Sequence, residues 1–140
     1  MKPKDLRLGH YLSLDGLPYR VAQITTPSVA GDLYDGFILE NGVEDEGTDI
    51  PLTPKILDAI GWYRGPFGTM YVVSNKPERR ATWNIESHNL VITRDDSTYE
   101  RRKRHTMLSL FVDNVRQLQD ALRICGMDDT MELRPKDIRE

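Results

Sequence analysis

ATWNIESHNLVIT, residues 81–93, holds two runs of β-branched, aromatic and aliphatic residues on either side of a short polar connection. The runs at 81–85 and 89–93 suit a pleated surface, and the residues between them have the polarity and length of a hairpin turn. Similar runs occur earlier, at 69–73, and later, at 107–112. Because consecutive strands usually pair with one another, these four runs predict an antiparallel β-meander.

The N-terminal part of the chain has a second hairpin signature. Asp15-Gly16 separates residues 9–14 from residues 18–25, and an Asp-Gly pair supplies the positive φ that tight hairpin turns need. A further strand is expected at 33–39. Several short strands this close together predict a small SH3-like β-barrel or a curved sheet over residues 1–39.

Two helices are marked by the residues at their ends. A short one is expected between Thr53, which suits an N-cap, and Gly61, which suits a C-terminal stop. A longer one is expected over residues 115–125, with Asn114 as its N-cap. Its apolar residues recur at helical spacing and predict a stripe that packs across the meander: Val115, Leu118, Leu122 and Cys125.

The length and composition indicate one globular domain. The chain has 140 residues, of which 39% are hydrophobic, and a formal net charge of −3. A chain of this size can bury a core without disulfides or metals. A last short strand is expected at 130–133. We therefore expect a single α+β domain over residues 1–140, with a hairpin or small barrel at 1–39, a solvated acidic loop at 40–49, the two helices and the meander at 50–133, and a frayed tail at 134–140.

The cellular location is expected to be the cytoplasm. Cys125 is the only cysteine, so the sequence supports neither an internal disulfide nor a zinc module built on paired cysteines. No apolar stretch approaches the length of a membrane span. The carboxylates at 40–49 lack the spacing of a calcium loop, which favours a linker over a metal site.

The densest charge in the chain is RRKRH, residues 101–105. Asp95-Asp96-Ser97 is a turn signal, so the basic run is expected on the returning arm of a hairpin. Guanidinium groups grip phosphates and an aromatic face stacks on a base, so nearby arginines and aromatic residues would complete a nucleotide site. The candidate ligand-binding residues are Arg101, Arg102, Lys103, Arg104, Arg79, Arg80, Arg94, Trp62, Tyr63, Trp83 and Tyr99.

Other interpretations of these residues stay open. Trp62 and Tyr63 directly follow a helix stop, where aromatic residues usually close a hydrophobic layer. The basic run would also serve to protect an edge strand, or to face an acidic protein partner in an interaction module. Extended nucleic acid is a less favoured partner, because a pI of about 5.6 gives little general attraction to a polyanion. A homo-oligomer would bring two basic runs together.

No catalytic or cofactor motif stands out. His10, His88 and His105 are widely separated, and Cys125 falls on the apolar stripe of the longer helix. We therefore expect no metal, no cofactor and no enzymatic activity. An active site assembled from residues distant in sequence is the alternative.

Three phrases give the chain a family resemblance. They are residues 6–9 ahead of the Asp15-Gly16 turn, residues 50–54 leading to 60–62, and residues 115–122. Together they resemble small uncharacterised proteins of bacterial phages, prophages and mobile elements. The resemblance assigns no activity, but it implies an accessory protein inside the bacterial host. In that setting the anion site would sequester a signalling nucleotide of host defence, or the module would dock on a host or phage protein.

Overall fold

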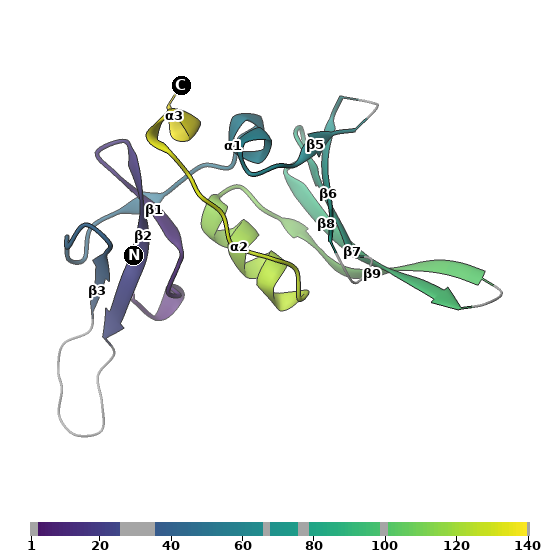
Figure 1. Ribbon diagram of the computed structural model, residues 1–140, viewed down its shortest axis with the longest axis horizontal. Helices are drawn as coiled ribbons and strands as arrows, with labels where there is room; N and C mark the ends of the chain where they lie inside the picture. The colour runs from purple at the N-terminus through teal and green to yellow at the C-terminus, as the bar shows by residue number, and fades with distance from the viewer. Residues whose placement is uncertain (1–2, 26–35, 66–67, 76–78, 99–100, 140) are drawn as a thin grey trace, which may run out of the picture. The chain divides into compact units, whose positions relative to one another are not determined.

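The computed structural model describes residues 3–25, 36–65, 68–75, 79–98 and 101–139, and it confirms the α+β class (Figure 1). Antiparallel sheets dominate, and the helices are short. The chain divides into two compact units. The N-terminal unit comprises Met1–Ile50 together with Arg134–Glu140, and the central unit is Pro51–Leu133.

The predicted N-terminal hairpin is confirmed. β1 (Tyr11–Leu14) pairs antiparallel with β2 (Leu17–Thr25), and the pair Leu14 and Leu17 closes the turn. Asp15 and Gly16 have φ of 52° and 76°. Two successive positive φ values make a turn whose twist matches that of the strands, which explains the Asp-Gly pair.

The N-terminal sheet is open among the described strands. Its order is β3-β2-β1-β4, with β3 (Gly36–Leu39) and β4 (Thr48–Asp49) at the two edges. A barrel would need these edges to pair, so an SH3-like barrel is not confirmed. Residues 33–35 of the expected third strand lie outside the described residues. The core of this unit consists of Leu6, Leu12, Val21, Phe37 and Leu39.

The prediction of a frayed tail at 134–140 was wrong. α3 (Pro135–Ile138) forms there, after the 3-10 turn η1 (Pro3–Asp5) and the strands of the same unit, and it contacts β2. Asp137 is buried, and its Oδ2 accepts the N–H of Arg134 at 2.8 Å. This bond satisfies a free donor at the helix start, and Pro135 suits the first helical position.

The expected strand at 130–133 does not form either. Thr130 donates both its N–H and its hydroxyl to Asp128 Oδ1, at 2.9 and 2.6 Å. A residue whose N–H bonds locally to an Asp side chain has no donor left for a sheet ladder there. The segment after the longer helix is therefore an extended connection stabilised by a local turn.

The short helix of the central unit is where the sequence predicts it. α1 (Pro54–Ala59) begins after Thr53, whose hydroxyl accepts the N–H of Ile56 at 3.3 Å. Ile56 and Leu57 are buried. The next element, β5 (Tyr63–Arg64), was not predicted. It is only two residues long and pairs with Val72 and Tyr71.

The predicted meander is confirmed as a five-stranded antiparallel sheet. Its order is β5-β6-β7-β8-β9, with β6 (Met70–Asn75), β7 (Arg79–Asn84), β8 (Asn89–Thr98) and β9 (Arg101–Phe111). The expected turn at Asp95-Asp96-Ser97 was wrong, because these residues continue β8. Its pairing with β9 runs on to Thr98 and Arg101.

The longer helix also agrees with the sequence. All four residues of the predicted stripe are buried, three of them in α2 (Val115–Ile124) and Cys125 at its C-cap. Asn114 Oδ1 accepts the N–H of Gln117 at 2.8 Å, as an N-cap should. In the described part of the chain, no helix has the length and hydrophobicity needed to cross a membrane.

Replacing Asn114 by Ala should lower the free energy of unfolding by about 1 kcal/mol, because the N–H of Gln117 loses its acceptor. Replacing Asn114 by Ser keeps an oxygen at that position and should preserve most of the stability. Urea denaturation of the two variants measures the difference. Equal losses in both would show that Asn114 does not act as the cap.

Candidate functional site

The basic run lies on a two-stranded arm. Pairing between β7 and β8 ends at Arg79 and Arg94, whereas pairing between β8 and β9 continues to Thr98 and Arg101. Among the described strands, residues 95–98 and 101–104 therefore pair only with each other. We call these two segments the arm; in Figure 1 they extend beyond the end of β7. The predicted place of the run, on the returning side of a hairpin, is confirmed.

The strand register determines which charged residues of the arm lie opposite one another. Its two acidic residues pair across the arm with two of its bases, Asp95 with Arg104 and Asp96 with Lys103. Ser97 pairs with Arg102. The arm thus has four bases and two acids, a net charge of 4 − 2 = +2. Positions that alternate along a strand belong to opposite faces, so each face of the arm has two basic positions and one acidic position.

The three arginines expected beside the run occupy the base of the arm. Arg79 and Arg94 are direct cross-strand partners, and His105 is the next residue in the same row. Arg80 pairs with Thr93, one position along, and therefore belongs to the other face of the sheet. Arg80 and Arg94 are exposed, whereas Arg79 is half-buried. Arg94 and Arg80 are thus accessible from solvent, on opposite faces.

Arg79 makes a structural contact that could not be predicted from the sequence. Its Nη1 donates to the carbonyl oxygen of Cys125, the residue that ends α2. The last carbonyls of a helix lack intrahelical partners, and a cation there also favours the helix dipole. The space beside this bond is tight, since a Cβ added to Gly126 would collide with Nη1 of Arg79. The guanidinium therefore ties β7 to the end of α2.

Two of the four candidate aromatic residues belong to the core. Trp83 is fully buried, and its Nε1 donates to the carbonyl oxygen of Val112 at 2.9 Å. Trp62 is only 5% exposed. A side chain buried to this degree has no face for a base, so the core interpretation of Trp62 holds, and Trp83 is a core residue as well. Tyr63 is 55% exposed, but it lies in β5, at the opposite edge of the sheet from β9. Tyr99 lies outside the described residues.

A stack of rings that runs from the buried Trp83 to the exposed edge of the sheet was not predicted. The ring of His88 lies between Trp83 and Phe111, with centroid separations of 4.9 and 5.9 Å. Phe111 is 57% exposed, and Met107 is 39% exposed. Both belong to β9, which the strand order places at the edge of the sheet. The apolar run at 107–112 resembles a core strand, and only its last place in the meander could have indicated an edge.

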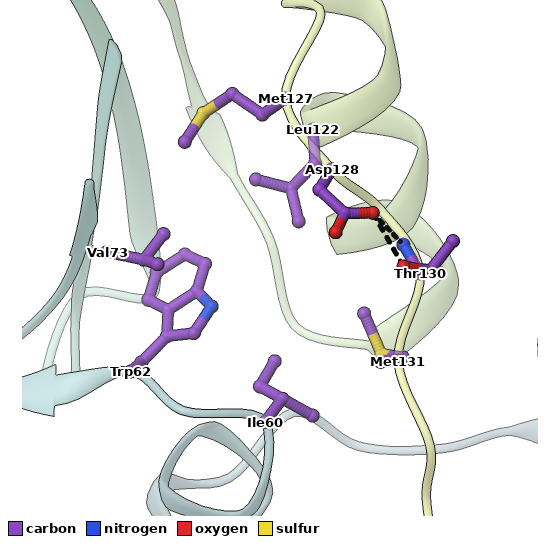
Figure 2. A pocket seen from close by; sticks show the side chains of 8 residues that line it. All are labelled: Ile60, Trp62, Val73, Leu122, Met127, Asp128, Thr130 and Met131. Carbon is purple, nitrogen blue, oxygen red and sulfur yellow. Dashed lines mark hydrogen bonds between the residues drawn. The ribbon is translucent and has the colours of Figure 1, made fainter. Parts of the chain in front are cut away.

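The central unit also contains a hollow of about 250 Å³ (Figure 2). Ile60 and Trp62 face Leu122 and Asp128 across it, and Met127 and Met131 complete the apolar wall. Thr130 holds the carboxylate of Asp128 by two hydrogen bonds, which lower the pKa of Asp128. Apolar walls with an ionised carboxylate do not suit a phosphate, so this hollow is separate from the anion site expected on the arm.

The remaining titratable groups of note are buried. The hydroxyl of Tyr71 donates to Asp58 Oδ2 at 3.3 Å, and burial and this contact raise the pKa of Tyr71. Burial also raises the pKa of the Cys125 thiol, although the nearby Arg79 acts in the opposite direction. In the ranges that the structure describes, no three His, Cys, Asp or Glu side chains gather as a metal site would require.

No family model, curated protein sequence or solved structure is significantly similar to this chain. The arrangement of the described residues is therefore the basis for a functional proposal.

Replacing Arg79 by Met should lower the free energy of unfolding by about 1–2 kcal/mol, because the last carbonyl of α2 loses a charged donor. The matched control is Arg80→Met, which removes the same charge from an exposed neighbour. Its effect should stay within about 0.5 kcal/mol. Urea denaturation compares them. Two equal effects would contradict a structural role for Arg79.

Iodoacetamide should modify Cys125 at least about tenfold more slowly in the native protein than in urea, because the thiolate reacts and the buried thiol has a raised pKa. Mass spectrometry of samples quenched over time at pH 8 measures both rates. Equal rates would show that the thiol is open to solvent.

Proposed function

We propose that the protein is a non-catalytic binding module that engages an extended anionic partner with the arm. The observation that supports this function is the run of four consecutive bases on a segment that pairs with no described strand but its own hairpin partner. Such a segment offers its charges from both faces to a partner longer than a single phosphate group.

The ligand is more consistent with an extended anion than with a single nucleotide. A nucleotide site needs a stacking face beside the cations, and the described aromatic candidates are buried or lie at the opposite edge of the sheet. The guanidinium of Arg79 already donates a hydrogen bond to the carbonyl oxygen of Cys125, at the end of α2. The basic positions of the arm alternate between its two faces, which suits contacts at several points along a partner chain.

The charge of the whole molecule supports a local site. The chain has a formal net charge of −3, although the arm alone contributes +2. The rest of the protein therefore contributes −3 − 2 = −5. A basic segment on an acidic body attracts anions only within about one Debye length, about 8 Å at physiological salt. This arrangement favours a defined partner over general coating of a polyanion.

The proposed setting is the bacterial cytoplasm, in the accessory repertoire of phages and mobile elements that the sequence resembles. A module of this kind would act by occupying a surface of a host or phage protein. The non-catalytic part of the proposal has support from two reactive residue types: Cys125 is a buried thiol with a raised pKa, and the ring of His88 stacks on two neighbouring rings.

The test measures binding of a fluorescein-labelled polyglutamate peptide by fluorescence anisotropy. The variant Arg101→Ala, Arg102→Ala, Arg104→Ala should raise the dissociation constant about tenfold or more, because three positive charges that would pair with glutamates of the peptide are lost. The control variant Lys55→Ala, Arg123→Ala, Lys136→Ala removes the same charge from exposed sites on the three helices. It should bind nearly as well as the unchanged protein.

Equal weakening by the two triple variants would overturn the proposal, because the effect would then belong to net charge and not to the arm. Thermal-shift measurements with cyclic nucleotides and ADP-ribose examine the nucleotide alternative. A shift with one of these compounds that the arm variant abolishes would replace the extended partner with a nucleotide.

A further inference from the structure

The two edges of the central sheet differ in what they offer to another chain. β5, at one edge, has two residues, whereas β9, at the other, has eleven. Among the described residues, β8 is the only strand that pairs with β9. A long edge strand presents main-chain N–H and C=O groups to which an extended chain can add as a further strand.

The hydrogen-bond pattern identifies the groups that point outward. Val112 donates its N–H to the carbonyl oxygen of His88 at 2.8 Å, so this pair faces inward. In an antiparallel ladder, inward and outward pairs alternate. The main-chain groups of Leu110 therefore face β8. The main-chain groups of Ser109 and Phe111 point away from β8, in the plane of the sheet. Both outward residues are exposed.

The usual protection of an edge strand is confined to one half of β9. Proteins protect such edges with charges and bulges. The basic run occupies positions 101–104, and a register shift between Ile92 and Thr93 leaves one extra residue on β9. Residues 107–111, Met-Leu-Ser-Leu-Phe, have no charge, and the side chains of Met107 and Phe111 are exposed. This half of the edge is apolar, and it ends before Asp113, whose carbonyl oxygen accepts the N–H of Leu52.

We propose that β9 takes an extended acidic segment of another protein as an added antiparallel strand. This inference rests on the proposed function and names its partner as a polypeptide. The apolar residues of the segment would lie opposite Ser109 and Phe111, and its acidic residues opposite positions 101–104. Because the added strand is antiparallel, the acidic residues follow the apolar ones in the partner's sequence. A strand with an apolar half and a basic half favours such a peptide over nucleic acid, because nucleic acid would bind only the basic half.

The decisive variant is Ser109→Pro. Proline lacks an N–H, and it is tolerated in edge strands where the N–H faces outward, so the β8–β9 ladder should remain. The matched control Ser109→Ala removes the hydroxyl, which accepts a hydrogen bond from Asn89, but keeps the main-chain donor. The probe is a fluorescent synthetic peptide of alternating valine and threonine followed by glutamates. We expect Ser109→Pro to weaken its binding about tenfold, and Ser109→Ala to have little effect.

A second measurement leaves the protein unchanged. Methylation of alternate main-chain nitrogens in the peptide removes its donors on one side and keeps its side-chain charges. The peptide methylated on the side that faces β9 should bind about tenfold more weakly than the unmethylated one. This comparison decides the question even if Ser109→Pro lowers the thermal stability of the protein.

Three outcomes would overturn the inference. One is equal binding of the methylated and unmethylated peptides, and another is unchanged binding by a folded Ser109→Pro variant. The third is a single-stranded oligonucleotide that binds more tightly than the peptide. In each of these cases polyglutamate binding that depends on the basic run would still support the proposed function. Loss of that dependence would remove the proposed function itself.

Discussion

The pairing of β8 with β9 is the interaction on which the central unit depends. At one end of this ladder, Leu90 and Ile92 are buried between their neighbours in β7 and β9. At the other end, the same two strands continue without β7 as the arm. A two-stranded ribbon has little stability alone, so the arm depends on the apolar half of its own strands to hold its register. The buried half of these strands and the charged arm are thus two parts of one continuous ladder.

Much of the fold could be predicted from the sequence, because its signals are local. The Asp15-Gly16 turn, the Thr53 and Asn114 caps and the stripe on α2 each depend on a few neighbouring residues. The errors arose where a local signal met a longer-range interaction. Asp95 and Asp96 favour a turn, but they continue β8 and pair with Arg104 and Lys103 of β9. Asp137 reaches back to Arg134, and this bond starts a helix in a segment that composition alone marks as a tail.

The residues of the candidate site also show that local sequence signals do not reveal longer-range contacts. The sequence could place the basic run on a hairpin, because the run follows a strand and precedes another. It could not separate Arg79 from Arg80, although one ties α2 to the sheet and the other lies in solvent. It also could not distinguish Trp83, which is buried, from Phe111, which is exposed. The face of β7 on which each arginine lies decides the first distinction, and strand order decides the second. Both depend on contacts between residues far apart in the chain.

The register shift between Ile92 and Thr93 has a consequence for how the arm could evolve. One extra residue in β9 interrupts the alternation of faces between Leu108 and the basic run. Because β8 continues without interruption, each base would keep its β8 partner, and therefore its face, if this residue were deleted. The faces of the positive charges are therefore set by their partners in β8, and the chain could lose the extra residue without reorienting them.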